Sequence, residues 1–309
     1  MTIGFITHAD CQHHDMGHGH PECPARIQAI VDQLKSSALY PHLKRYDANL
    51  ASKEQLCQAH DAAYVETIFK LSPKQNAHVQ LDPDTVMNPH TLNAARRAAG
   101  AVVQAVDLVM NGKHGQVFCC VRPPGHHAEH HKAMGFCFFN NIAVGVYHAL
   151  NHWNITRAAV VDFDVHHGNG SEDILKRESR VLFCSTFQHP YYPYSGTTPE
   201  SSNCISVPLP AYTTSEPYRD AVRKQLLPPL ASFKPQLIFI SAGFDGHKDD
   251  PLAQHQLNEA DYAWITHEIK TIADQWAQGR IISSLEGGYD LQALALSVQA
   301  HLHALHGDI

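Results

Sequence analysis

Short runs rich in β-branched and aromatic residues recur along the chain, each bounded by polar or turn-forming residues. Such runs are typical of β-strands. They predict strands at residues 2–7, 116–121, 158–163, 181–186, 204–207, 237–242 and 281–285.

Longer segments between most of these runs carry apolar residues at three- and four-residue spacing, which is typical of amphipathic helices. They predict helices at residues 24–36, 89–111, 141–151, 214–233, 258–278 and 291–305. The alternation of strands and helices predicts a three-layer α/β/α fold with a mainly parallel sheet. With 309 residues and 44% hydrophobic content, we expect one domain over residues 1–309.

Unusual polar sequences follow four of the predicted strands. They are RPPGHH at 122–127, DVHHGNG at 164–170, GFD at 243–245 and EGGY at 286–289. In open parallel sheets, ligands bind beyond the carboxyl ends of the strands, where the loops converge. We therefore expect these four segments to share one rim of the sheet.

The segment around residue 164 has the pattern of a metal site. Asp162, Asp164 and His166 alternate, so their side chains point to the same side of an extended chain. Asp245 is placed by the same strand-end argument to complete a set of two carboxylates and one imidazole with an open position. None of the eight cysteines falls in these loops, which argues against a closed structural zinc site. Asp162 is expected one layer further out, orienting a histidine or held by backbone N–H groups.

Hydrolysis at a metal also needs groups that accept and donate protons. His126 and His127 follow a rigid Pro-Pro-Gly turn and can both border the cleft. Taken alone, the pair fits a structural role equally well.

Composition excludes several other functions. The chain has 23 Lys and Arg against 30 Asp and Glu, a net charge of -7, so we expect neither nucleic acid nor an anionic membrane as a partner. No apolar run reaches the length of a bilayer span, and the first ten residues lack signal-peptide features, which predicts a cytoplasmic protein. An N-terminal group of histidines admits a second metal site, but a flexible polar loop at the cleft entrance is favoured. Its members are His8, His13, His14, His18 and His20.

These motifs together resemble the histone deacetylase superfamily. The similar segments are HPECPAR at 20–26, HDAAY at 60–64, RPPGHH at 122–127, GFCFFNN at 135–141, DFDVHHGNG at 162–170, GFD at 243–245 and EGGY at 286–289. They occur in the family's order and cover nearly the whole chain. The resemblance implies an arginase-like three-layer fold and a zinc-dependent deacetylase.

Carried over position by position, the resemblance implies zinc ligands at Asp164, His166 and Asp245. It assigns His126 and His127 to the family's tandem histidine pair, of which one or both serve as general base and acid, without dividing the work between them. Three further catalytic positions are matched: Tyr289, whose hydroxyl would stabilise the developing oxyanion, Asp162, which would orient His126, and Asn169, behind His127.

Asn169 stands where one branch of the family has an aspartate. Together with Asp250-Pro-Leu252 it is similar to the class II branch. An amide stabilises an imidazolium less than a carboxylate does, so we expect His127 to have a lower pKa than its counterpart in the other branch.

The resemblance also implies a narrow substrate tunnel. Its matched positions are Gly135, Phe136, Tyr192, Leu252 and Gly288. Asp84 corresponds loosely to a family aspartate that meets the substrate backbone, although an ordinary loop carboxylate fits equally well. Family members commonly bind K⁺ near the zinc, and the resemblance implies that backbone carbonyls around Asp162 and the side chain of Ser185 would bind it here.

The leading hypothesis is a deacylase acting on acyl-lysine in a protein or peptide. An acetylpolyamine amidohydrolase is the alternative. The acidic net charge favours it, because it would attract a cationic substrate. Leu252 argues against it, since polyamine-selective relatives carry an acidic residue at the matching position. A non-catalytic module should have lost a metal ligand, a histidine of the pair or the tyrosine, and here all of them are present. An arginase-type dinuclear manganese enzyme would need additional bridging carboxylates, and the RPPGHH sequence argues against it. The sequence leaves open whether the protein forms a homo-oligomer and whether Fe²⁺ or Co²⁺ replaces Zn²⁺.

Overall fold

The computed structural model describes residues 2–75, 77–198 and 200–307. Its centre is an eight-stranded sheet in the order β2-β1-β5-β10-β9-β6-β7-β8, and every neighbouring pair is parallel. The strands are β1 Ile3–Thr7, β2 Leu43–Asp47, β5 Gln116–Cys119, β6 Ala158–Asp162, β7 Val181–Gln188, β8 Cys204–Leu209, β9 Leu237–Ala242 and β10 Ile281–Leu285. All seven predicted strands are confirmed, and the sheet is more uniformly parallel than expected.

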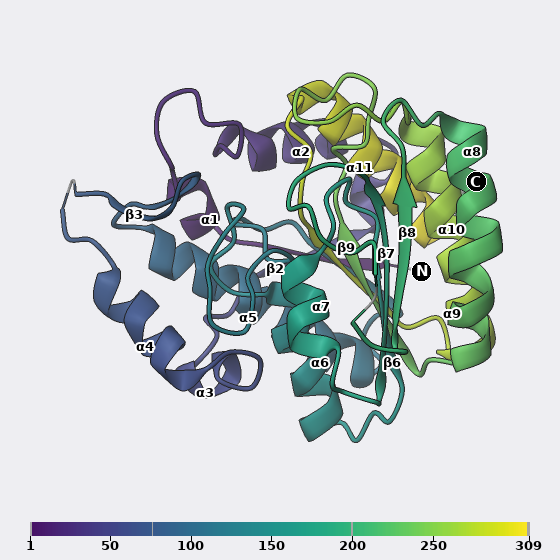
Figure 1. The fold of residues 1–309 in the computed structure, drawn as a ribbon, viewed down its shortest axis with the longest axis horizontal. Coiled ribbons are helices and arrows are strands. Elements are labelled where there is room, and N and C mark those ends of the chain that lie inside the picture. Colours follow the sequence, from purple (N-terminus) through teal and green to yellow (C-terminus); the bar gives the residue numbers. More distant parts are fainter. Residues whose placement is uncertain (1, 76, 199, 308–309) are drawn as a thin grey trace.

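Helices cover both faces of this sheet, so the predicted three-layer α/β/α architecture is confirmed (Figure 1). α5 and α6 pack together on one face, whereas α2, α10 and α11 pack together on the other. The helices are α1 Asp10–His13, α2 Ala25–Lys35, α3 Lys53–Leu56, α4 Ala62–Leu71, α5 Thr91–Met110, α6 Asn141–His152, α7 Asn169–Leu175, α8 Ser215–Ala221, α9 Leu227–Phe233, α10 Glu259–Trp276 and α11 Leu291–His306, with a 3₁₀ turn at Tyr40–His42. Among the described residues no helix has the length and apolar content needed to cross a bilayer.

Burial follows from this layering. Every residue of β5, β6, β7, β9 and β10 is buried, because each strand lies between two others and under helices on both faces. The edge strand β2 has the sequence LKRYD and is partly exposed throughout. Its charged residues explain why the apolar pattern did not predict it. The small antiparallel hairpin of β3 Val79–Asp82 and β4 Thr85–Met87 was also missed, because strands of four and three residues are too short to show an alternating pattern.

The predicted helix at 214–233 is interrupted. α8 passes into a π-helical turn at Val222–Leu226 before α9 begins. Within the π-helical turn, Leu227 N–H donates to the Val222 carbonyl five residues back. Pro228 and Pro229 supply no backbone N–H, so the regular helical hydrogen bonds cannot continue unbroken from this turn into α9.

His60 connects the segment between α3 and α4 to the loops at 122–141 by two hydrogen bonds. Its Nδ1 donates to the carbonyl oxygen of Glu129 at 3.0 Å, and its Nε2 accepts from the backbone N–H of Asn140 at 2.9 Å. A ring nitrogen that accepts a hydrogen bond carries no proton, so this arrangement requires a neutral imidazole. Burial lowers the pKa of His60 to about 4.

This geometry predicts acid sensitivity. The pKa of His60 falls from 6.5 to about 4 on folding, so the unfolded chain binds more protons as pH drops through that window. Stability should therefore be lost below pH 6.5, with this residue contributing up to ~1.4 kcal/mol per pH unit. His60→Gln should reduce the slope of unfolding free energy against pH by that amount, measured by denaturant titration. The exposed His18→Gln is the control, and an unchanged slope in His60→Gln would contradict the assignment.

Candidate active site and metal centre

The four polar segments converge as expected. β5, β10, β9 and β6 are consecutive neighbours in the sheet and all run in the same direction. Their carboxyl ends therefore lie side by side, and the loops that follow them build one site. The strand-end argument from sequence is confirmed at this level.

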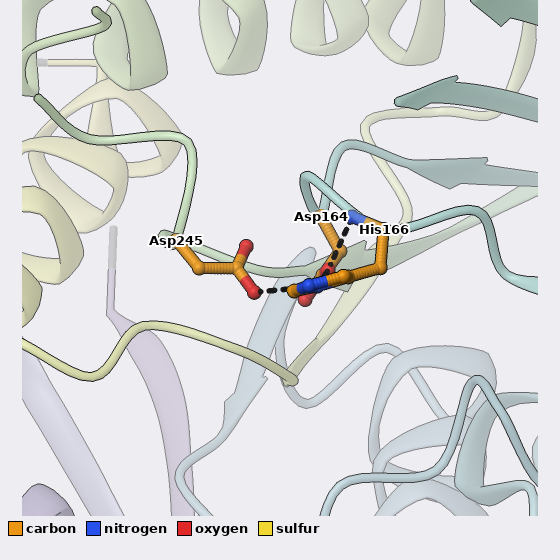
Figure 2. Close-up of side chains that lie close together, drawn as sticks. All are labelled: Asp164, His166 and Asp245. Atoms are coloured by element: carbon orange, nitrogen blue, oxygen red, sulfur yellow. Dashed lines mark hydrogen bonds and ion pairs between the residues drawn. The ribbon is translucent and has the colours of Figure 1, made fainter. Parts of the chain in front are cut away.

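A compact group of three ionisable side chains forms the base of the site. Asp164, His166 and Asp245 each offer one ligand atom, and these atoms lie within 4.8 Å of one another (Figure 2). His166 Nδ1 is 3.0 Å from Asp164 Oδ1 and 3.1 Å from Asp245 Oδ2. All three residues are buried. The arrangement can hold one divalent cation, and it is the only such cluster found in residues 2–75, 77–198 and 200–307.

Backbone groups hold the two carboxylates in place. Gly287 N–H donates to Asp164 Oδ2 at 2.8 Å, and Val165 N–H donates to Asp245 Oδ1 at 3.0 Å. A Cβ at Gly287 would collide with Oδ2 of both aspartates, and one at Gly243 would collide with Asp164. The two glycines of the motifs are therefore required by the close approach of backbone to the cluster.

The electrostatics of the cluster favour a positive charge at its centre. Burial would lower the pKa of His166, but hydrogen bonds and charges from Asp164 and Asp245 raise it to about 10. Burial and the negative charge of Asp164 raise the pKa of Asp245. A bound divalent cation would replace the second proton of the His166 imidazole and would compensate the charges of both carboxylates.

The tandem histidines, His126 and His127, lie against this cluster, and their ring centroids are 4.0 Å apart. His126 Nδ1 is 3.0 Å from Asp162 Oδ2, which places Asp162 behind His126 as expected. His127 Nδ1 is 2.7 Å from Asn169 Oδ1. Each imidazole thus has its own orienting partner.

The two histidines have opposite pKa shifts. Burial opposes the charge on His126, but Asp164 and Asp162 raise its pKa well above the usual range, an effect that a cation on Asp164 would offset in part. Burial and the charges of His126 and His166 lower the pKa of His127 well below that range. The hydrogen bond with Asn169 acts in the opposite direction, so the amide is not what lowers this pKa.

A cavity of about 250 Å³ reaches the cluster at His166. Its lining residues are Asp84, His127, Gly135, Phe136, His166, Tyr191, Tyr192, Tyr194, Leu252 and Tyr289. Of the five matched tunnel positions only Gly288 is absent from this wall; its carbonyl oxygen accepts from Arg26 Nε at 2.7 Å. Tyr191 and Tyr194 were missed, although the Tyr191-Tyr-Pro-Tyr194 run beside the matched Tyr192 was a usable signal.

Tyr289 forms one wall near the cluster. Its ring meets Phe136 edge-on, with centroids 5.9 Å apart, and the Arg26 guanidinium lies 4.9 Å from its centroid. Its backbone N–H donates to Asp250 Oδ2 at 2.7 Å. Burial and the charge of Asp245 raise the pKa of Tyr289 well above its usual range, so the hydroxyl stays a hydrogen-bond donor.

The expectation of a flexible N-terminal histidine loop is wrong for His14. This side chain is fully buried, with Nδ1 at 2.8 Å from Thr91 Oγ1 and Nε2 at 3.5 Å from Glu22 Oε2. His20 packs its ring against Phe136 at 4.7 Å between centroids and so supports the cavity wall. Packing against buried neighbours therefore fixes these two side chains, although the polar sequence of the segment predicted a flexible loop.

Comparisons with known proteins identify the family and support the fold. The chain matches the histone deacetylase domain model over residues 20–305. It is 35% identical to Type-2 histone deacetylase 2 of Dictyostelium discoideum over 98% of its own length, but it spans only 21% of that protein. It is 36% identical to the histone deacetylase-like amidohydrolase of Pseudomonas aeruginosa, covering 88% of this chain and 73% of that one. The HDA15 HD domain structure matches with a TM-score of 0.92 at 29% identity, covering 99% of this chain and 89% of that one.

The cluster predicts a specific metal-binding phenotype. Asp245→Asn should lower the affinity of the cluster for a divalent cation by more than about 100-fold, because it removes a charged side chain of the cluster itself rather than an outer partner. Competition with a chelating dye would measure it. The exposed Asp249→Asn is the matched control and should bind as wild type does. Wild-type affinity in Asp245→Asn would place the metal elsewhere.

Proposed function

The chain belongs to the histone deacetylase family, and from this membership we propose that it hydrolyses the amide of N-acyl-lysine in proteins or peptides, using Zn²⁺ held by Asp164, His166 and Asp245. One observation carries the proposal. His166 of the buried cluster lines a cavity whose wall also contains His127 and Tyr289, and the other two members of the cluster, Asp164 and Asp245, lie next to His166. Three groups therefore border the same space: the cluster that can bind a cation, His127 as a proton acceptor, and Tyr289 as a hydroxyl donor.

The cavity suits a long, narrow side chain. Tyr192 meets the His127 ring edge-on at 5.3 Å between centroids, and Phe136 meets Tyr289 in the same way at 5.9 Å. These rings bring apolar surface close to the polar base. An acyl-lysine would place its methylene chain between aromatic walls and its amide at the cluster.

Proton transfer is assigned to His127. Bound Zn²⁺ would supply Lewis acidity, which polarises a carbonyl and makes water more acidic. His127 lines the cavity, and its Nδ1 is engaged by Asn169, which leaves Nε2 to accept a proton from water and return it to the amine. His126 does not line the cavity, and we assign it an electrostatic role beside Asp162 and Asp164.

Tyr289 is assigned to the developing oxyanion. Its hydroxyl remains protonated because burial and Asp245 raise its pKa. A donor fixed before the reaction stabilises the transition state more than the ground state. Arg26 and Asp250 hold this residue from the ring side and the backbone side.

We also propose that a K⁺ ion binds near the cluster, and Ser185 supports this site. It is paired with Asp162 in the register of β6 and β7, and its buried Oγ has no hydrogen-bond partner among the described residues. Buried hydroxyls normally find a partner, so a cation coordinated by Oγ and nearby backbone oxygens would satisfy it.

An acetylpolyamine is the second candidate substrate, and Asp84 favours it. This carboxylate lines the cavity and, with the net charge of -7, would attract a second ammonium group. Leu252, also on the lining, offers that ammonium no partner.

Turnover of an acetyl-lysine peptide and of N-acetylputrescine by the Zn²⁺-bound protein separates these candidates. We expect the peptide to have the higher kcat/KM. Tyr289→Phe should lower kcat by about 10²–10³-fold, as loss of one oxyanion donor does. The exposed Tyr212→Phe is the control and should retain full activity.

Three other results have defined meanings. A higher kcat/KM for N-acetylputrescine would replace the lysine substrate with the polyamine. Full activity in Tyr289→Phe would contradict its assigned role. A metal-bound protein inactive on both substrates would contradict acetyl-amide hydrolysis.

A further inference from the structure

Asn169 lies between His127 and a residue outside the proposed chemistry. Its Oδ1 is 2.7 Å from His127 Nδ1, and its Nδ2 donates to Glu129 Oε1 at 2.8 Å. Nδ2 is also 3.4 Å from Met134 Sδ, a weaker acceptor. The side chains of His127, Asn169 and Glu129 therefore form a continuous hydrogen-bonded chain.

The backbone of Glu129 is held independently of this chain. Its N–H donates to Lys132 carbonyl oxygen at 2.9 Å, and its own carbonyl accepts from His60 Nδ1 at 3.0 Å. Its carboxylate lines a second cavity, of about 310 Å³, together with Asn169. Within the described part of the chain no ion pair involves Glu129, so Asn169 is the partner of its charge there.

The amide of Asn169 has two unlike ends, and its partners decide which end faces His127. A carboxylate only accepts hydrogen bonds, so Glu129 can pair with Nδ2 but not with Oδ1. This leaves Oδ1 toward His127, where it accepts a proton held on Nδ1. The flipped amide would set oxygen against the carboxylate and would offer an N–H donor to Nδ1, which favours the other tautomer.

We propose that Glu129 is a positioning residue that fixes the Asn169 amide and, through it, holds His127 in the tautomer with the proton on Nδ1. That tautomer leaves Nε2 unprotonated on the cavity side. The catalytic consequence rests on the role proposed above for His127, whereas the tautomer itself does not. A group behind an imidazole can affect catalysis by selecting the tautomer. In the other tautomer of His127 the proton would be on Nε2, which could then accept no proton from water.

The tautomer is read directly from ¹⁵N shifts of the ring nitrogens in histidine-labelled protein at a pH where His127 is neutral, with His127→Gln identifying the signals. Wild type should show Nδ1–H. Glu129→Ala should show a mixture of tautomers, and Glu129→Gln should restore Nδ1–H because its amide oxygen can still accept from Asn169. Glu200→Ala removes another carboxylate of the same cavity that does not contact Asn169, and it should match wild type.

Kinetics supply a second test that a merely structural role would not pass. Glu129→Ala should lower kcat by about tenfold with KM little changed, and Glu129→Gln should recover most of the loss. Asn169→Asp alone sets two carboxylates face to face and should also lower kcat. Adding Glu129→Gln to Asn169→Asp should raise kcat again, because the new amide can donate to the new carboxylate.

Two results would overturn the proposal: a wild-type Nδ1–H tautomer in Glu129→Ala, or no recovery when Glu129→Gln is combined with Asn169→Asp. Failure of the proposed function gives a different outcome. If wild type hydrolyses neither substrate, the kinetic arm is lost, but the ¹⁵N shifts still decide whether Glu129 controls the tautomer.

Discussion

Two carboxylates buried beside one imidazole are the constraint on which the rest of the site depends. Asp164 and Asp245 lie out of water, and burying two like charges costs several kcal/mol for each ion unless donors and a cation compensate them. Three backbone N–H groups from two segments supply the donors: Val165 and His166 in the loop after β6, and Gly287 in the loop after β10. The loops after neighbouring parallel strands bring these donors to one point, which makes the site depend on the sheet.

A second buried charge system fastens the N-terminal segment to this site. Glu22, Arg26 and Arg122 are all fully buried, and both arginines pair with Glu22. Arg26 also donates to the carbonyl oxygens of Glu286 at 2.5 Å and Gly288 at 2.7 Å. Those two carbonyls flank the turn that presents Tyr289. Removing one partner would leave an uncompensated buried charge, so this network fixes the tyrosine loop rigidly rather than merely filling space.

The reach of the sequence can be judged from particular residues. Period-two alternation placed Asp164 and His166 together, and strand-end logic added Asp245, because both rules act over short distances in a regular backbone. Resemblance supplied Tyr289 and Asn169. Neither route predicted Glu129, since its contact with Asn169 depends on where the loop after His127 folds back. The partly exposed β2 and the buried His14 likewise depend on tertiary packing that no local pattern encodes. Tyr191 and Tyr194 differ from them, because the tyrosine run around the matched Tyr192 was a signal that could have found both.

The amide at position 169 makes sense once the buried charges are considered together. Asp162, Asp164, Asp245 and Glu286 already lie buried around the tandem histidines. A carboxylate behind His127 would add another negative charge within this group, facing Glu129. An amide satisfies the imidazole without that charge and passes the hydrogen bond outward. The carboxylate that ends the chain then borders the second cavity, where solvent lowers the cost of its charge.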